Sequence, residues 1–260
     1  MEDKSANGVQ ELAKKAVGLI DLTNLNDDCT ADDIVELCEQ AHTPAGPVAA
    51  VCVWPRFVGQ AVRALDGSDL RVATVVNFPD GGDDVRATMR ETKQCVADGA
   101  HEIDLVMPYR AFASGDADVA RSMISTIRAT TDGSALLKVI LETGELKDAT
   151  LIADASVMAL AEGADFIKTS TGKVAVNATL DAARIMLDAI KSHGDRARGF
   201  KPAGGIRTTE DAQAYLALAS EIMGQDWATK ATFRFGASTL LGNLLATLDL
   251  SDIAGSDSAY

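Results

Sequence analysis

The sequence predicts a single (β/α)8 TIM barrel spanning residues 1–260. Eight short runs rich in apolar and β-branched residues predict strands. Longer segments whose apolar residues recur about every 3.6 positions lie between these runs and predict helices. Successive runs mostly start about thirty residues apart, which is the length of one strand–helix unit. Eight such units in a chain of this length are typical of the barrel.

The strands are expected, in order, at residues 17–23, 48–53, 70–76, 101–107, 136–142, 165–170, 198–203 and 232–237. The residues before Val17 predict an extra N-terminal helix, and the polar residues 251–260 predict a mobile C-terminal tail. The alternative fold is an open doubly wound sheet. The absence of a G-x-G-x-x-G motif after the first strand argues against it.

Helix signals fill the intervals between the strands. Thr30 is the expected N-cap of a helix, with Asp33 three residues further on, which is the spacing of a capping box. Four later segments also have helical spacing, and three of them reach a glycine at or near their end. These segments are residues 115–130, 148–164, 177–194 and 208–224.

Composition limits the function classes. The net charge of −14 argues against nucleic acid or an anionic membrane as the main partner. The four cysteines and three histidines show no metal-ligand spacing, so we expect reduced thiols, a cytoplasmic protein, no metal and no other cofactor. Neither a signal peptide nor a membrane-spanning helix is expected near the start of the chain.

Strand alternation predicts which charged side chains face the inside of the barrel. Successive strand residues point to opposite faces, and the apolar set must face the covering helices. The charged set then faces the lumen, with four acids and four bases: Asp21, Glu102, Asp104, Glu142, Lys138, Lys168, Lys201 and Arg234. Equal numbers permit a neutral network, whereas a lone buried charge costs several kcal/mol.

Two interpretations of these charges stay open. A structural ion network is the simpler one and is favoured for Glu102, Glu142 and Arg234. For Lys168 and Lys201 we favour chemistry, because lysine is poorly suited to rigid bidentate pairing. Burial and a second cation lower the pKa of an amine, and a neutral amine can attack a carbonyl to form a Schiff base. Alternation alone does not say which lysine is the nucleophile.

Glycine-rich loops after the sixth, seventh and eighth predicted strands indicate an anion site. Each loop alone is equally consistent with an ordinary turn. Together they lie where barrels of this kind hold phosphate on backbone N–H groups and helix N-termini, with Thr208 as one expected N-cap. The expected substrate is a small phosphorylated carbonyl compound. The candidates are Gly172, Lys173, Gly204, Gly205, Arg207, Gly236, Ser238 and Thr239.

Other residues near strand ends are supporting candidates. Asp21 and Thr23 lie at the end of the first predicted strand, and Thr171 lies in the turn after the sixth. Cys52 is on the inward face of the second strand, where packing is the simpler interpretation and lining a pocket is the alternative.

Long motifs in this chain closely resemble the deoxyribose-phosphate aldolase family. They are "EIDLVMPYR", "LLKVILETGEL", "DFIKTSTGK", "GFKPAGGIRT" and "FGAS". The resemblance runs from "DLTNLNDD" to Tyr260. It implies a metal-free class I aldolase on a (β/α)8 barrel, often a homodimer. That family reversibly cleaves 2-deoxy-D-ribose 5-phosphate to D-glyceraldehyde 3-phosphate and acetaldehyde.

The resemblance also implies roles for residues in matching motifs. Lys168 would form the Schiff base, and Lys201 would be the neighbouring cation that lowers its pKa. Asp104 would assist proton transfer, and Lys138 would support the network. Tyr260 would carry a proton from the C-terminal tail, and the glycine-loop residues named above would surround the phosphate.

This sequence departs from the family pattern at three positions. Trp54 stands where a smaller ring or a polar residue is expected, which affects one wall of the site. Thr239 replaces an expected serine and Ile206 an expected valine, both conservatively.

Rival functions are another phosphosugar-acting barrel enzyme, such as a Schiff-base aldolase of different substrate or a two-carboxylate isomerase. A pyridoxal-phosphate barrel and a non-enzymatic phosphosugar-binding protein are further alternatives.

Overall fold

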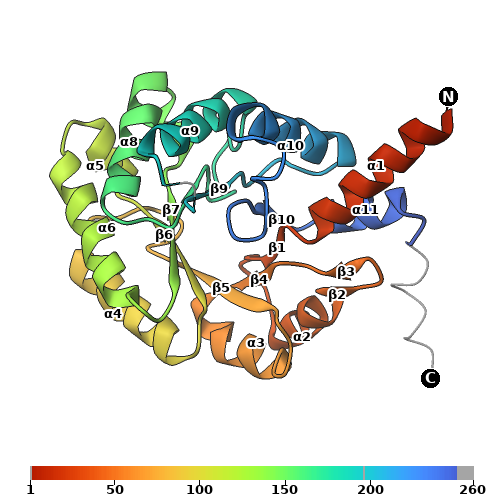
Figure 1. Cartoon of the computed structure of the whole chain (residues 1–260). Helices are drawn as coiled ribbons and strands as arrows, with labels where there is room; N and C mark the ends of the chain where they lie inside the picture. The colour runs from red at the N-terminus through yellow and green to blue at the C-terminus, as the bar shows by residue number, and fades with distance from the viewer. Residues whose placement is uncertain (1, 196, 251–260) are drawn as a thin grey trace.

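The computed structural model describes residues 2–195 and 197–250. Its strands form a central ring surrounded by helices, which confirms the predicted barrel (Figure 1). The strands are β1 (Ile20–Asn24), β4 (Ala50–Val53), β5 (Arg71–Val76), β6 (Glu102–Val106), β7 (Leu136–Ile140), β8 (Phe166–Lys168), β9 (Gly199–Lys201) and β10 (Phe235–Ala237). Each lies within one of the eight predicted segments, except that β1 extends one residue further, to Asn24.

All eight strands run parallel, in the order β10-β1-β4-β5-β6-β7-β8-β9. Parallel bridges between Phe200 and Phe233 and between Ala203 and Gly236 join β9 to the β10 segment and close the ring. The carboxyl ends of all eight strands therefore meet at one end of the barrel, where enzymes of this architecture hold their active sites.

Helices follow the strands and form the outer layer. They are α1 (Glu2–Val17), α2 (Ala31–Gln40), α3 (Val58–Ala64), α4 (Val85–Ala97), α5 (Tyr109–Ala113), α6 (Ala117–Thr131), α7 (Thr143–Leu146), α8 (Ala149–Ala161), α9 (Leu180–His193), α10 (Thr209–Met223) and α11 (Leu240–Thr247). Thr30 and Thr208 each form a capping box, with Asp33 and Asp211. Both predicted N-caps are confirmed.

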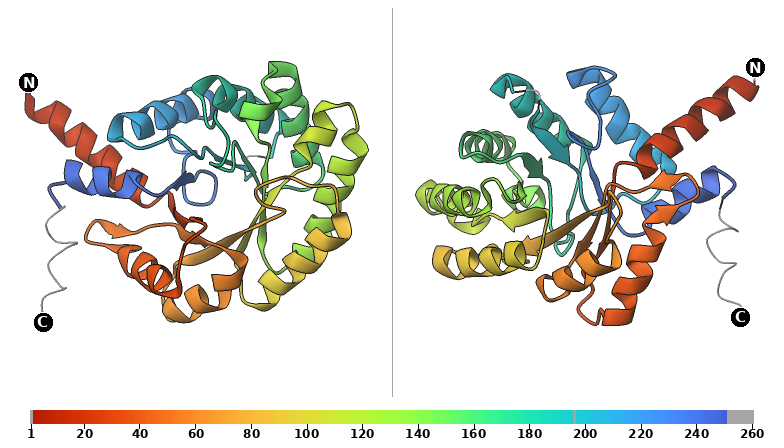
Figure 2. Two further views of the ribbon diagram at one scale, coloured as in Figure 1. Left: turned by 180° about the vertical axis from the view of Figure 1, so that it is seen from behind. Right: turned by 60° about the horizontal axis from the view of Figure 1, so that its bottom comes forward.

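Two small features lie outside the predicted pattern. The strands β2 (His42–Thr43) and β3 (Gly46–Pro47) pair as an antiparallel hairpin beside the barrel. A single 3-10 turn, η1 (Pro55–Phe57), follows β4. The predicted N-terminal helix is present as α1, and it projects beyond the ring of helices in both views of Figure 2.

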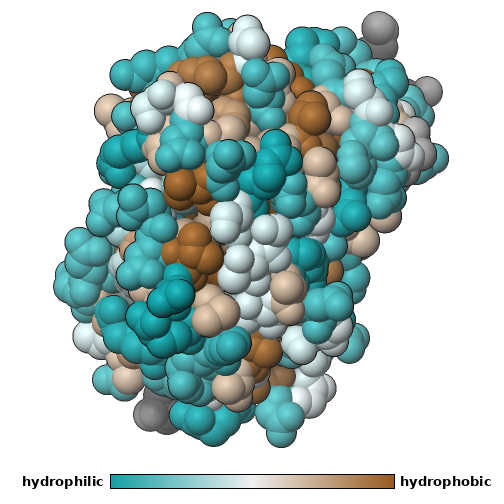
Figure 3. All heavy atoms as spheres, turned by 90° about the vertical axis from the view of Figure 1, so that its left-hand side faces the viewer, coloured by the Kyte–Doolittle hydropathy of each residue, from teal (hydrophilic) through white to brown (hydrophobic). Residues whose placement is uncertain are grey.

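The hydrophobic core lies between the strands and the helices, as the alternation requires. Outward strand residues such as Ile103, Val139 and Ile167 are buried in it. A separate small apolar cluster lies inside the ring and consists of Leu25, Cys52, Ala73 and Val75, with Trp54 and Phe78 against it. The outer surface over α5, α6 and α8 is mainly hydrophilic, with scattered apolar spots (Figure 3). Among the described residues, no helix has the length and apolar character needed to cross a bilayer.

Candidate active site

Three buried residues at the centre of the barrel come from separate strands. Lys168 is the last residue of β8 and Lys201 the last residue of β9, and the two are direct neighbours in the strand register. Asp104 occupies the middle of β6 on the inward face. At most 4% of the surface of each residue is exposed. Because all three lie on the inward face of their strands, their side chains occupy the lumen.

One carboxylate oxygen links the two lysines. Lys168 Nζ and Lys201 Nζ each lie 2.8 Å from Asp104 Oδ2. The two nitrogens therefore lie within twice that distance of each other. The other oxygen, Asp104 Oδ1, accepts a hydrogen bond from Lys138 Nζ at 2.8 Å.

Further ion pairs extend this group toward the amino ends of the strands. Lys138 Nζ lies 2.5 Å from Glu102 Oε2. Arg234 donates to Glu102 Oε1 at 2.8 Å and to Asp21 Oδ1 at 2.6 Å. Asp21 also accepts a hydrogen bond from Lys201. We call these seven residues the lumen network: Asp21, Glu102, Asp104, Lys138, Lys168, Lys201 and Arg234.

Among the described residues, Glu142 is buried but makes no ion pair with the lumen network, so the prediction that it continues the inward face of a regular strand was wrong. The strand β7 ends at Ile140, and Glu142 has left-handed backbone angles (φ 58°, ψ 58°), which break the alternation. Its buried carboxylate accepts hydrogen bonds from the backbone N–H of Thr171. Burial raises its pKa, and the Thr171 hydrogen bonds and the Lys168 cation only partly oppose that change. The network therefore holds four bases but three acids.

This imbalance has a direct chemical consequence. With every group ionised, the lumen network would carry one uncompensated positive charge in a water-poor space, which is costly. Loss of one proton from one amine makes the network neutral. The surroundings of each amine decide which one loses that proton most easily.

Lys168 is the amine whose pKa falls. Burial is the largest influence and lowers its pKa, the Lys201 cation lowers it further, and Asp104 opposes both. Burial also acts downward on Lys201, but Asp104 and Asp21 together outweigh it and raise the pKa of Lys201. Lys138 behaves in the same way, with Asp104 and Glu102 as the main partners that raise its pKa.

The carboxylates of the network remain ionised. Burial alone would raise the pKa of Asp104, but Lys138, Lys168 and Lys201 together hold it well below its usual range. The pKa of Asp21 is lowered in the same way by Lys201 and Arg234, against the effect of burial. Both side chains can therefore accept hydrogen bonds and stabilise cations.

The predicted phosphate loops surround the carboxyl end of β8, β9 and β10. Gly172, Gly204 and Gly205 have φ values of 86°, 83° and 84°, which side chains rarely adopt, so glycine is required there. A Cβ on Gly236 would lie 2.8 Å from Ala203 Cβ and 3.1 Å from Lys201 Cε. Glycine thus lets strand β10 approach the end of the Lys201 side chain.

The polar candidates of these loops differ in position. Ser238, Thr239 and Arg207 are exposed, and Thr239 is the N-cap of α11 with no hydrogen bond from its side chain to the helix. Lys173 instead reaches across the mouth of the barrel. Its Nζ lies 3.4 Å from Asp27 Oδ1 and 6.0 Å from the centre of the Trp54 ring.

Trp54, the main departure from the family pattern, forms one wall of this mouth. Its Nε1 donates to the carbonyl of Asn26 at 2.9 Å, and its ring meets Phe78 edge-on at 5.5 Å. The wall is apolar on the side of β4 and β5, opposite the lysines of β8 and β9.

The supporting candidates that the structure describes are also near the lumen. Cys52 is fully buried within the inner apolar cluster, and burial raises the pKa of its thiol. The hydroxyl of Thr23 donates to the carbonyl of Asp21 at 2.8 Å, and that of Thr171 accepts from the N–H of Lys173 at 3.0 Å. Tyr260 and the predicted mobile tail, residues 251–260, lie outside the described residues.

Sequence reasoning missed Asn177, which underlies the glycine loop. A Cβ on Gly204 would lie 2.7 Å from Asn177 Cβ, so the two residues are in close contact. Asn177 Oδ1 is buried and has no hydrogen-bond partner among the described residues. No motif distinguishes this asparagine from an ordinary loop residue.

The described part of the chain contains no group of three or more His, Cys, Asp or Glu side chains arranged to hold a metal ion. What the site does offer is an amine of lowered pKa, an ionised carboxylate beside it and a second ammonium group. Such a set can form an iminium with a carbonyl compound and move protons around it.

Comparisons with known proteins agree with this chemistry. Residues 15–245 match a family model described as DeoC/LacD family aldolase. A deoxyribose-phosphate aldolase from Agrobacterium fabrum is 55% identical over 253 residues, covering 96% of this chain and 97% of the relative.

Solved structures give the same result. A protein from Coccidioides immitis, provisionally named a deoxyribose-phosphate aldolase, has a TM-score of 0.80 at 28% identity, over 95% of this chain and 96% of its own. A tetrameric deoxyribose phosphate aldolase from Aeropyrum pernix has a TM-score of 0.75 at 22% identity, over 93% of each chain, which supports the fold.

Proposed function

Because the chain belongs to the DeoC/LacD aldolase family, we propose that it cleaves 2-deoxy-D-ribose 5-phosphate through a Schiff base on Lys168. The products are D-glyceraldehyde 3-phosphate and acetaldehyde, and the reaction is reversible. The observation that carries this proposal is the contact of the Lys168 and Lys201 amines with one oxygen of Asp104, which accompanies the lowered pKa of Lys168.

The reaction begins with the neutral amine. Lys168 Nζ attacks C1 of the open-chain sugar phosphate, and loss of water gives an iminium. The iminium withdraws electrons from the C2–C3 bond. When a base removes the proton of the C3 hydroxyl, that bond breaks and glyceraldehyde 3-phosphate leaves. Protonation of the remaining enamine at C2 and hydrolysis of the iminium release acetaldehyde and free Lys168.

Asp104 and Lys201 are the proposed proton-handling groups. The ionised Asp104 lies 2.8 Å from Lys168 Nζ, so it can stabilise the positive charge of the iminium as it forms. Lys201 shares the same oxygen and carries a proton that it can donate. Asp21 and Lys138 hold these two groups in place from the amino side.

The phosphate of the substrate is assigned to the loops after β8, β9 and β10. Gly172, Gly204 and Gly205 allow tight turns that expose backbone N–H groups. The N-termini of α10 and α11 follow directly, and helix N-termini favour anions. Lys173 adds a positive charge at the mouth once it exchanges Asp27 for the substrate.

The proposal is tested by trapping the covalent intermediate. Acetaldehyde and borohydride should fix an ethyl group on one lysine, and peptide mass mapping should place that group on Lys168. Lys168→Ala should lower kcat on the order of 10^4-fold or more, because no other neutral amine is positioned to replace it. Release of glyceraldehyde 3-phosphate measures the turnover.

An exposed lysine provides the control. Lys191→Ala removes the same charge from the surface of α9 and should leave both trapping and turnover unchanged. Trapping on Lys201, or normal turnover by a folded Lys168→Ala variant, would refute the assignment of the nucleophile.

Assembly and compartment remain proposals. We propose a homodimer on the basis of the family resemblance, which light scattering of the purified chain would test. We also propose a cytoplasmic location, supported by four cysteines that are all buried as free thiols.

A further inference from the structure

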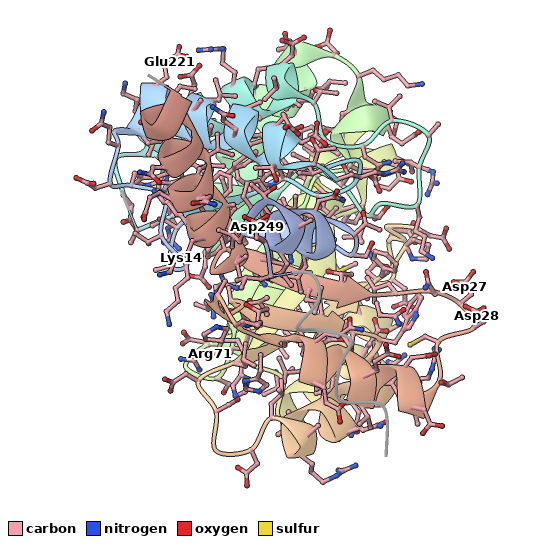
Figure 4. The ribbon with its side chains drawn as sticks, turned by 90° about the vertical axis from the view of Figure 1, so that its right-hand side faces the viewer. Lys14, Asp27, Asp28, Arg71, Glu221 and Asp249 are labelled. Carbon is pink, nitrogen blue, oxygen red and sulfur yellow. The ribbon has the colours of Figure 1, made fainter. Side chains whose placement is uncertain are left out.

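A cavity of about 870 Å³ opens at the amino ends of the strands, opposite the proposed catalytic end. In Figure 4, Arg71, which begins β5 and lines this cavity, lies on the opposite side of the molecule from Asp27 and Asp28, which follow the carboxyl end of β1. The volume suits a small metabolite. None of the residues assigned to the substrate lines it.

Lysine and arginine side chains outnumber carboxylates by one in the lining of this cavity. It contains five lysine and arginine side chains, namely Arg71, Arg128, Arg198, Lys230 and Arg234, against the four carboxylates Asp69, Glu102, Asp132 and Asp165. This local excess occurs in a chain whose net charge is −14. The amino end is therefore unusual in favouring an anion.

The ion pairs in the cavity leave part of this positive charge available. Arg128 and Arg198 share the carboxylate of Asp165, at 2.7 Å and 3.2 Å, and Arg198 Nε also lies 3.1 Å from Asp195 Oδ2. Within the described ranges, neither Arg71 nor Lys230 has a carboxylate at ion-pair distance. Guanidinium groups match phosphate oxygens in a bidentate geometry, so converging arginines favour a phosphorylated ligand.

The cavity is also connected to the lumen network. Arg234 lines the cavity, and its guanidinium donates to Asp21. Asp21 binds Lys201, which shares Asp104 with Lys168. A continuous series of charged contacts therefore runs from the cavity to the catalytic amine.

We propose that this amino-end cavity binds a small phosphorylated metabolite with two or more negative charges, and that the bound anion slows turnover through Arg234. A negative charge beside Arg234 makes the lumen more favourable for cations. Lys168 is then protonated more often, and a protonated amine cannot attack a carbonyl. The effect lowers kcat and does not compete with the substrate, because the two sites lie at opposite ends of the barrel.

Inorganic pyrophosphate is the probe, and isothermal titration measures its binding. The combined variant Arg71→Ala with Lys230→Ala should weaken binding by about tenfold or more, since it removes the two unpaired cations. The matched control is Arg90→Ala with Lys93→Ala, two exposed cations on α4 that lie outside the cavity. The control should change binding by less than about twofold, because distant surface charges are screened.

Turnover gives the second measurement. Pyrophosphate should lower kcat of the wild type and of the control with no rise in KM, and the cavity variant should resist this inhibition. Absence of binding at millimolar pyrophosphate, or equal weakening in both paired variants, would overturn the site. Inhibition that raises KM alone, or binding that leaves kcat unchanged, would overturn the coupling. Binding is measured without the reaction, so the site can be tested even if the proposed substrate is wrong.

Discussion

The two halves of the lumen contain similar charged side chains but differ in how fully those charges are paired. In the amino half, Arg234 and Lys138 lie against two carboxylates, those of Glu102 and Asp21. In the carboxyl half, Lys168 and Lys201 meet at a single oxygen of Asp104. Counted over the seven residues of the lumen network, the surplus positive charge therefore lies in the carboxyl half, where Lys168 also acts on the buried carboxylate of Glu142.

The same comparison separates the two lysines of the carboxyl half. Lys201 has a second carboxylate partner in Asp21, whereas Lys168 forms its ion pair with Asp104 alone among the described residues. A cation with fewer partners loses its proton more easily when buried. Pairing, more than burial, therefore decides which lysine becomes a nucleophile, because all three lumen lysines are buried.

The largest expected effect on this comparison comes from the shared carboxylate. Asp104→Asn leaves two buried amines without their common anion, and we expect kcat to fall about 10²–10⁴-fold. Loss of one partner of a buried ion pair should also cost about 3–5 kcal/mol of unfolding free energy. Product release and urea denaturation measure the two effects.

The pH dependence of the Asp104→Asn variant provides a check. Without the Asp104 carboxylate, the pKa of Lys168 in the folded variant should lie further below its unfolded value of about 10.4. The unfolded chain then binds more protons, so the stability of the variant should rise as pH increases toward that value. A variant whose stability falls over that range would contradict the assigned charges.

Lys201→Leu should have the next largest effect. It removes the cation that helps to lower the pKa of Lys168, so the pH–rate profile of kcat/KM should move to higher pH. Burial still lowers that pKa, so the profile should shift by about one to two pH units. Activity at neutral pH should then fall about 10–100-fold and recover partly in alkali.

Lys138→Leu is the matched control for this shift. Lys138 contacts the other oxygen of Asp104, away from Lys168, so its removal should move the profile less than the Lys201→Leu change does. Profiles with the same midpoint in the wild type and in Lys201→Leu would refute the role of Lys201.

The smallest effects should distinguish two buried glutamates. Glu102→Gln leaves Arg234 and Lys138 short of one anion and should lower the unfolding free energy by about 3 kcal/mol. Glu142→Gln keeps an acceptor for the N–H of Thr171 and should cost less than about 1 kcal/mol. Equal losses on urea denaturation would place Glu142 back in the network.

Much of the site could be predicted from strand alternation alone. Asp21, Asp104, Lys138 and Lys201 all lie in the lumen, because each belongs to a regular strand. The prediction for Glu142 failed because alternation holds only while the strand continues, and β7 ends two residues earlier. The left-handed turn there has no clear signal in the sequence.

Strand alternation did not separate Lys168 from Lys201; the family resemblance assigned the Schiff base to Lys168, and the coordinates supply a physical reason for that choice. Both lysines end a strand on the inward face, so the sequence pattern is the same for each. The contact of Asp21 with Lys201 joins residues from β1 and β9, and their register across the barrel is set only when the ring closes. The amino-end cavity likewise depends on cations from separate loops, from the start of β5 and from α6, which share no motif.

The most direct test of the central claim is the pKa of the Lys168 amine itself. Lysine labelled at Cε with carbon-13 allows NMR titration of each amine, and the signal lost in Lys168→Ala identifies that residue. We predict that the Lys168 signal titrates below the ordinary value of about 10.4, while the Lys138 and Lys201 signals titrate above it. A Lys168 amine that titrates at or above the ordinary value, or a Lys201 amine that loses its proton first, would contradict the account.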